Sequence, residues 1–434
     1  MPAPDSAAAA PGGLPPPPAP RFAALAHRDF RLYLAAHVLS RAGSQFQAFA
    51  LSWHVYLLTD SPLALGLIGA AKVAPVLLLA LGGGVLADAY DRRRVMLFTQ
   101  AGLAATSAAM AVLTWSGRAS APALFALIAA SGVALAFDNP ARAAMVTNLV
   151  PRKDLPNALG ISVLGWQMAS VLGPSVAGLL LARTSLTFLY AADAATFVVM
   201  IGAVLAIRSQ GRARAADEPR LSGWRSALEG VRFLRGQPVL LAMMGLDFIA
   251  TFFAGALLLM PIYADKILHV GEKGLGLLMA APSVGALLAG AWIAATPPIR
   301  RQGFVMLAAV AAYGACIAAF GVSTSFTVSL VLLAGSGAAD AVSTVVRVVA
   351  RNLLTPDALR GRMTSINMLF FMGGPQLGEL EAGVVAQLTT VPVSVAGGGL
   401  LCLAAVAATA ALVPQLRRHR IEHAPAEEAV PDAP

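Results

Sequence analysis

The feature that most constrains this chain is a series of long apolar stretches without any charged residue. Residues 95–117, 155–182, 274–299, 302–339 and 382–416 contain no Asp, Glu, Lys or Arg. A helix needs about 20 mostly apolar residues to cross a bilayer. The stretches also lack the alternation of a membrane β-barrel. The sequence therefore predicts an all-α integral membrane protein.

The composition supports this interpretation. Charged residues make up 12% of the chain, whereas a soluble domain contains about 25%. Such a chain cannot cover a water-facing surface, which argues against a soluble enzyme, a nucleic-acid-binding protein and a disordered scaffold. The two cysteines, Cys316 and Cys402, lack the spacing of a metal site. We expect no metal and no cofactor.

We predict about twelve membrane-spanning helices, arranged as two bundles of six. Their predicted ranges are 30–58, 62–87, 95–116, 121–146, 157–182, 186–207, 238–263, 274–296, 303–322, 326–352, 363–388 and 392–415.

Basic residues predict the topology, because loops rich in Lys and Arg stay in the cytoplasm. With a cytoplasmic N-terminus, 23 of the 31 Lys and Arg residues fall in cytoplasmic segments. Both termini are then cytoplasmic. The expected organisation is a Pro/Ala-rich tail (1–27), an N-terminal six-helix bundle (28–208), a cytoplasmic linker (209–236), a C-terminal bundle (237–416) and a cytoplasmic tail (417–434).

The two halves resemble each other weakly. The sequence ALGLI at 64–68 is similar to GLGLL at 274–278, and the Gly-Pro pair at 173–174 recurs at 374–375. The offsets are 210 and 201 residues. Two matches in the same order favour a duplication. Tandem repeats with a binding site between them are typical of secondary transporters.

The loop after the second predicted helix has the pattern G-x-x-x-D-x-x-x-R-R, formed by Gly84, Asp88, Arg92 and Arg93. It resembles the signature of the major facilitator superfamily at this loop, which implies a role in conformational gating. The fifth helix contains Gly160, Gly173, Pro174 and Gly178. These residues resemble the Gly/Pro-rich motif of proton-coupled exporters in the same superfamily. Small residues let helices approach closely.

Shorter stretches resemble the enterobactin-exporter-like branch of this superfamily. They lie at 28–32 (RDFRL), 140–142 (PAR), 355–362 and 378–383. The resemblance implies a bacterial inner-membrane permease that exports small molecules, and it leaves the substrate open.

Charged residues within the helices are the candidates for mechanism, because a charge at bilayer depth costs about 2.5–3.5 kcal/mol. Asp138 with Arg142 and Asp340 with Arg347 lie near the cytoplasmic helix ends and are candidate gate ion pairs. The candidates for proton or substrate binding are Arg41, Lys72, Asp247 and Glu379. Arg41 and Asp247 are 206 residues apart, within the range of the repeat. We expect Asp247 to carry the proton and Arg41 to pair with it or to tune it, with a static buried ion pair as the alternative.

The sequence thus predicts a secondary active transporter that works by alternating access. The expected activity is proton-coupled export of a siderophore, drug or metabolite by a monomer in the bacterial inner membrane. Its partners are the small-molecule substrate, protons and the lipid bilayer, without nucleic acid. We expect no enzymatic activity, and a phosphate-binding G-x-x-x-x-G-K-[ST] loop is lacking. An importer or uniporter of the same fold stays open, as does a non-transporting membrane receptor or an intramembrane enzyme.

Overall fold

The computed structural model describes residues 22–87, 91–208, 232–255, 257–297, 299–356 and 359–420. Within these ranges the regular elements are helices, and no strand occurs. The first half contains η1 (Ala23–Ala26), α1 (Arg28–Thr59), α2 (Pro62–Ala87), α3 (Arg92–Trp115), α4 (Ala121–Leu149), η2 (Arg152–Asp154), α5 (Leu155–Leu181) and α6 (Leu186–Ala206). The second half contains α8 (Pro238–Phe253), η3 (Leu257–Leu259), α9 (Met260–Ile262), η4 (Tyr263–Ile267), α10 (Gly271–Ala295), α11 (Gln302–Gly321), α12 (Phe326–Leu354), α13 (Arg360–Leu388), α14 (Val391–Leu412) and α15 (Pro414–Arg418).

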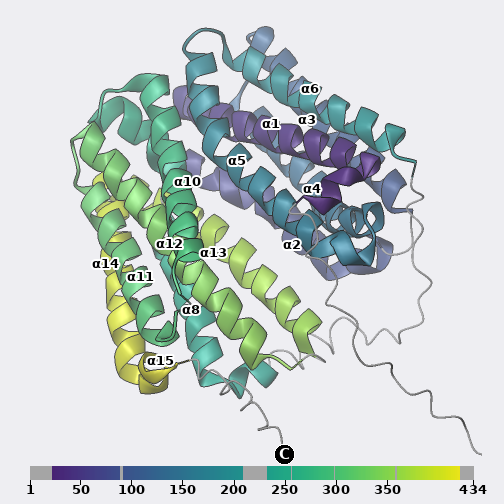
Figure 1. Cartoon of the computed structure of the whole chain (residues 1–434). Coiled ribbons are helices and arrows are strands. Elements are labelled where there is room, and N and C mark those ends of the chain that lie inside the picture. Colours follow the sequence, from purple (N-terminus) through teal and green to yellow (C-terminus); the bar gives the residue numbers. More distant parts are fainter. Residues whose placement is uncertain are drawn as a thin grey trace, which may run out of the picture.

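The helices form two bundles that lie side by side, α1–α6 in one and α8–α14 in the other (Figure 1). Within the first bundle α3 packs on α6, and α1 on α5 and α6; within the second, α10 packs on α12, and α11 on α14. The main contacts between the bundles are those of α2 with α13 and of α5 with α10. The predicted pair of six-helix bundles is therefore confirmed.

The seventh crossing differs from the single helix predicted over 238–263. The α-helix α8 ends at Phe253, and the chain continues through short 3₁₀ and α segments into a π-helical turn that ends at Ile267. Gly255 has low helix propensity, and Pro261 lacks the N–H that a continuous helix would need. The hydroxyl of Tyr313 donates to the freed carbonyl of Ala254 at 3.2 Å.

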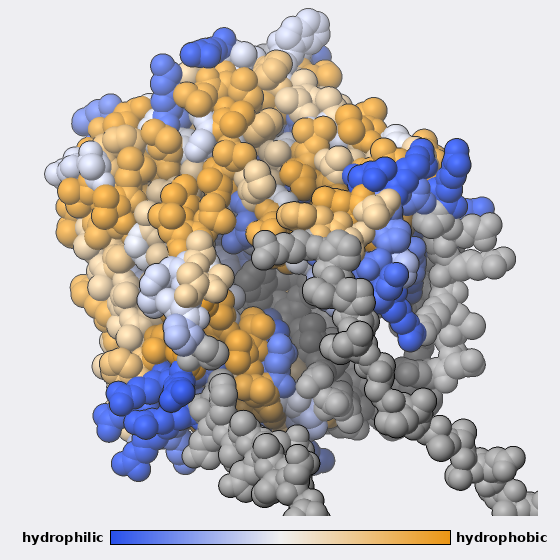
Figure 2. Space-filling model, viewed as in Figure 1, coloured by the Kyte–Doolittle hydropathy of each residue, from blue (hydrophilic) through white to orange (hydrophobic). Residues whose placement is uncertain are grey.

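The outer surface is apolar enough to face lipid. Ten stretches of the described chain are long and apolar enough to cross a membrane. The helices α1 and α13 complete the predicted twelve; they are long but more polar, with Arg41 and Glu379 in their middle sections. Figure 2 shows apolar side chains over the visible flanks and hydrophilic ones gathered toward the margins. Phe98 and Trp115 illustrate the apolar exterior, at 78% and 79% exposed.

The helix ends define two ends of the molecule. We call "basic end" the end at which α1 and α3 begin, α6 ends, and Arg301 and Arg417 lie. At the opposite end the chain turns between α1 and α2, where Asp60 adopts a left-handed conformation (φ 47°). Pro62 then begins α2, a position where its missing N–H costs nothing.

Candidate functional site

A cavity of about 180 Å³ lies at mid-depth, mostly within the first bundle and closed on one side by α13. Two of its lining residues are cations, Arg41 from α1 and Lys72 from α2, and none is a carboxylate. Its polar and apolar lining comprises Arg41, Ser44, Gln47, Lys72, Val73, Val76, Leu103, Ser131, Leu135, Asn139, Phe197 and Gln376. Among these, Arg41 Nε and Gln376 Oε1 are buried and have no hydrogen-bond partner in the described part of the chain. The cavity therefore presents positive charge and unused hydrogen-bonding atoms.

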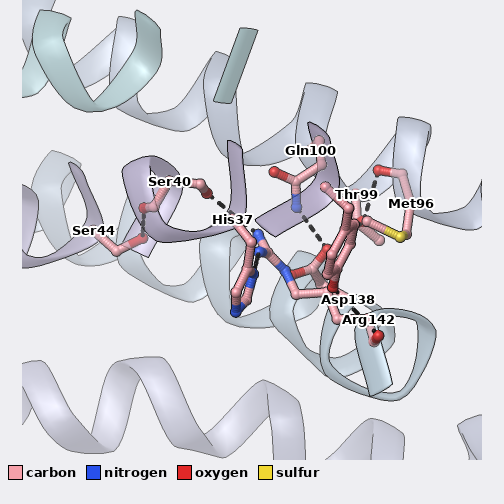
Figure 3. Close-up of polar contacts among 9 residues, drawn as sticks. His37, Ser40, Ser44, Met96, Thr99, Gln100, Asp138 and Arg142 are labelled. Carbon is pink, nitrogen blue, oxygen red and sulfur yellow. Dashed lines mark hydrogen bonds and ion pairs between the residues drawn. The ribbon is translucent and has the colours of Figure 1, made fainter. Parts of the chain in front are cut away.

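A buried polar network lies beside the cavity on α4 (Figure 3). Arg142 forms an ion pair with Asp138 one turn earlier, with side chains 7% and 1% exposed. The Asp138 carboxylate also accepts hydrogen bonds from Thr99 (2.9 Å) and Gln100 (2.6 Å) of α3. The structure thus contains the first predicted pair, and α3 satisfies its remaining acceptors, as a buried charge requires.

Arg142 also connects α4 to α1. Its guanidinium donates to His37 Nδ1 at 2.6 Å and to the Ser40 hydroxyl at 3.3 Å. The Arg142 backbone carbonyl accepts from the buried Tyr33 hydroxyl at 3.3 Å. Arg41 lies near enough to interact electrostatically with Arg142. One carboxylate therefore faces two guanidinium groups here, and the excess positive charge adjoins the cavity.

The second bundle pairs its charges differently from the prediction. Asp247 of α8 forms an ion pair with Arg347 of α12, with side chains 13% and 12% exposed. Arg347 also donates to Thr344 at 2.8 Å. In the described structure neither the expected Asp340–Arg347 pair nor an Arg41–Asp247 pair is formed. Asp340 precedes Arg347 by two helical turns, whereas the neighbouring helix α8 brings Asp247 to the guanidinium.

Glu379 of α13 packs directly against the other bundle. A Cβ added at Gly69 of α2 would collide with the Glu379 carboxylate, so the acid lies on the α2 backbone. Lys72, one turn further along α2, interacts electrostatically with Glu379. Lys72 is exposed in mid-helix because it faces the cavity. One predicted cation and one predicted acid thus interact electrostatically across the bundle interface.

Glycines bring the two bundles into close contact near the opposite end. In the α5–α10 contact, a Cβ on Gly178 would lie 2.7 Å from the Glu272 carbonyl oxygen and 3.0 Å from Gly276 Cα. In the α2–α13 contact, a Cβ on Gly66 would lie 2.6 Å from the Glu379 carbonyl oxygen. Neither site has room for a side chain. The close approach expected of the fifth-helix motif therefore occurs between bundles at Gly178.

The other residues of that motif have different surroundings. A Cβ on Gly173 would lie 2.5 Å from Gln45 Cβ, so this glycine brings α5 close to α1 within one bundle. The Pro174 carbonyl lies 2.7 Å from a Cβ built on Gly276. Gly160 has nothing within 4 Å of such a Cβ, so close packing does not require glycine there.

Three polar contacts reinforce the closed end, and the sequence indicated none of them. The Tyr56 hydroxyl donates to the Asp265 carboxylate. Lys266 forms an ion pair with Asp60 at 2.6 Å, and Ser61 donates to Gln387 at 3.1 Å. Each of these contacts joins a side chain of one bundle to a side chain of the other. The described side chains therefore join the bundles at the opposite end.

The loop motif after α2 is described in part. Gly84 lies within α2, and Asp88 is outside the described residues. Arg92 begins α3. The backbone N–H of Arg93 donates to Asp91, which caps the helix at 2.9 Å, and the Arg93 guanidinium donates to the Leu205 carbonyl at 2.8 Å. Arg93 thus ties the start of α3 to the end of α6.

Two six-helix bundles with a polar cavity at mid-depth define a membrane transporter of the major facilitator superfamily, not an enzyme. A family described as transmembrane secretion effector matches residues 19–431, and the chain belongs to it. It is 26% identical over 396 residues to the "Enterobactin exporter EntS" of Escherichia coli O139:H28, covering 91% of this chain and 94% of the relative. The same protein of Escherichia fergusonii gives the same values.

Solved structures share the fold. A bacterial homologue of the human lysosomal transporter Spinster, inward-facing and unoccupied, has a TM-score of 0.68 at 15% identity and covers 92% of this chain and 99% of its own. A bacterial homologue of the iron transporter ferroportin, in the inward-facing state, has a TM-score of 0.67 at 16% identity, covering 90% and 99%. With the family match and the exporter relatives, this fold identifies the chain as a multi-pass membrane protein and a secondary transporter.

Proposed function

We propose that this transporter exports a small anionic molecule across the bacterial inner membrane in exchange for protons, acting as a monomer by alternating access. The relatives at 26% identity are named as exporters of enterobactin, which favours export. The mid-depth cavity supports an anionic substrate, and the electrostatic interaction of Lys72 with Glu379 supports proton coupling.

The single observation that carries the substrate class is the charge of the cavity. Arg41 and Lys72 line it without any carboxylate among its lining residues. Asn139, Ser44 and Gln376 add hydrogen-bonding groups. Two cations that line the same cavity attract an anion and disfavour a cation. An apolar wall that includes Phe197 leaves room for a partly hydrophobic substrate.

The basic end faces the cytoplasm in this proposal, following the distribution of basic residues. Both termini then lie on the cytoplasmic side. Because the bundles are joined at the opposite end, the structure corresponds to the conformation that receives substrate from the cytoplasm. Rocking of one bundle against the other separates the α2–α13 and α5–α10 contacts and opens the outer side.

Glu379 is the proposed proton site. In the present conformation Glu379 interacts electrostatically with Lys72. When α2 and α13 separate at the outer end, Glu379 moves away from Lys72 and is exposed to the periplasm, where the lower pH favours uptake of a proton. Return to the present conformation restores the interaction with Lys72, which favours the ionised carboxylate, and the proton is released inward. Lys72 and the proton thus alternate as partners of the same carboxylate.

Asp247, the proton carrier expected from the sequence, becomes the second candidate, because Arg347 holds its carboxylate in this conformation. Breaking that pair is a condition for Asp247 to titrate. The proton gradient supplies enough free energy to drive export, whichever of the two residues carries the proton. One proton entering down about 100 mV contributes about 2.3 kcal/mol, and a difference of one pH unit adds about 1.4 kcal/mol.

The test is uptake into everted inner-membrane vesicles, whose lumen corresponds to the periplasm. Enterobactin is the first probe, followed by matched panels of anionic and cationic compounds. We expect uptake of an anion that depends on an acidic lumen and stops when a protonophore is added. Uptake that does not depend on the pH gradient refutes proton coupling. A preference for cationic compounds refutes the proposal that the substrate is an anion. Uptake into right-side-out vesicles instead identifies an importer.

Variants separate the two roles. Arg41→Gln and Lys72→Gln should weaken anion binding, whereas Lys273→Gln, on a residue outside the cavity, serves as a control. Glu379→Gln should abolish gradient-driven uptake while exchange of substrate across the membrane continues. If Asp247→Asn loses the dependence of uptake on the pH gradient and Glu379→Gln keeps it, then Asp247 is the proton site.

A further inference from the structure

A second cavity, of about 330 Å³, lies on the outside of the second bundle at the basic end. Four arginines and one aromatic residue line it: Arg301, Phe304, Arg417, Arg418 and Arg420. None of these residues belongs to the substrate cavity or to the bundle interface. In Figure 2 a dense hydrophilic patch lies at the lower left, directly below an apolar surface, where Figure 1 shows α15.

The short helix α15 is fixed in place and presents its arginines in a defined position. Leu416 of α15 is fully buried in the core of the second bundle. A Cβ on Gly303 would collide with the Leu416 carbonyl oxygen, so α15 packs directly on the start of α11. The Gly303 N–H donates to the His419 carbonyl at 3.3 Å. Arg301, just before α11, is thereby held close to Arg417 and Arg418.

The positive charge of this cavity is not neutralised within the described part of the chain. No carboxylate of that part lies within 4.0 Å of the four arginines, and none of their guanidinium groups has a hydrogen-bond acceptor there. Burial lowers the pKa of the His419 imidazole, so near neutral pH the arginines supply the charge. Four converging like charges repel one another, and a bound anion removes that repulsion.

The surroundings indicate an amphipathic anion. Phe304 is 57% exposed beside the arginines, and Leu412, just before α15, is 81% exposed. Both residues belong to helices that cross the membrane, so the cavity lies where the apolar surface meets the aqueous phase. A phosphodiester matches the bidentate geometry of guanidinium groups, and acyl chains match the apolar surface next to it.

We propose that this cavity binds the headgroup of an anionic phospholipid, with its phosphate held by the four arginines and its acyl chains along Phe304 and Leu412. Basic pockets at membrane surfaces are suited to such headgroups. The proposal is independent of the transported substrate and of the direction of transport. It assigns α15 the task of attaching the second bundle to the lipid surface.

The experiment measures retention of phosphatidylglycerol and phosphatidylcholine by the purified full chain in neutral detergent, using native mass spectrometry. We expect preferential retention of phosphatidylglycerol. Each arginine near an anionic surface contributes about a fivefold increase in affinity, so Arg417→Gln/Arg418→Gln should weaken phosphatidylglycerol binding about 25-fold. The matched control is Arg118→Gln/Arg183→Gln, which removes the same charge from the opposite end.

Three outcomes overturn the proposal. The first is equal retention of the two lipids, or an equal loss in the control variant. The second is displacement of phosphatidylglycerol by millimolar inorganic phosphate, which indicates a site for free anions. The third involves residues 421–434, which contain Glu422, Glu427, Glu428 and Asp432. Binding of phosphatidylglycerol only by a chain that ends at Arg420 identifies this acidic segment as the occupant.

Discussion

The contact between Gly178 and Gly276 makes a quantitative prediction about conformational balance. In Gly178→Ala the new methyl group would lie 2.7 Å from the Glu272 carbonyl oxygen and 3.0 Å from Gly276 Cα. The closest acceptable separation is several tenths of an ångström longer. Overpacking of this kind costs about 1–3 kcal/mol. The strain lies between bundles, so opening this end relieves it, and the ratio of closed to open molecules should fall about 5- to 150-fold.

Cross-linking measures this ratio at a different contact of the same end. Ser61 and Gln387 are hydrogen-bonded at 3.1 Å across the bundles, so a short bifunctional thiol reagent should join Ser61→Cys to Gln387→Cys only when the end is closed. The background carries alanine in place of Cys316 and Cys402. The cross-linking rate should be high in this background and fall when Gly178→Ala is added.

The control is Gly160→Ala, on the same helix α5, where a Cβ has nothing within 4 Å. This variant should cross-link at the background rate. An equal rate in Gly178→Ala and Gly160→Ala would refute the inference that the glycine contact governs closure. Gly276→Ala provides a second check, because its Cβ would lie 2.7 Å from the Pro174 carbonyl oxygen.

Two further predictions concern ion pairs. Asp138→Asn leaves Arg142 buried without its counter-charge and should destabilise the protein by about 3–5 kcal/mol, measured by thermal unfolding in detergent. The double variant Asp138→Asn/Arg142→Gln should regain much of this stability, and the absence of any recovery would contradict the pairing. Lys266→Ala removes an ion pair with Asp60 whose side chains are 50% and 63% exposed. It should therefore change stability by no more than about 1 kcal/mol, and a larger loss in the same assay would show that the exposed pair holds the closed end.

The sequence predicted the twelve crossings because bilayer length and apolar composition act on each helix separately. Whether a segment crosses the membrane depends little on its neighbouring helices, so charge-free stretches and basic loops suffice to predict the crossings. The two most polar crossings, α1 and α13, show the limit of hydropathy. They contain Arg41 and Glu379, whose cost is offset by the cavity and by packing on α2. Their existence had to be inferred from length and from the neighbouring helices.

Partners across helices were not predictable from spacing along one helix. Arg142 does bind the acid four residues earlier, but Arg347 binds Asp247 of another helix. Likewise, Tyr56 gave no signal in the sequence, because its role depends on meeting Asp265 of the other bundle. Sequence distance fixes neighbours within about one turn, and beyond that the tertiary packing decides.

The internal repeat has few identical residues, but its positions in the structure relate it to the contacts between the bundles. Gly66 and Gly276 occupy matching positions of the repeat, and Arg142 and Arg347, 205 residues apart, fall within the range of its offsets. The matched glycines make the two inter-bundle contacts, so the similarity preserves closure of one end. Arg41 and Asp247, 206 residues apart, also fall within the range of the repeat offsets, but in the described structure each interacts with a charge of its own bundle. There Asp247 neutralises Arg347, whereas Arg41 adds a second positive charge beside Arg142. One charge reversal between the repeats thus leaves the first bundle with the uncompensated cation that the proposed anionic substrate requires.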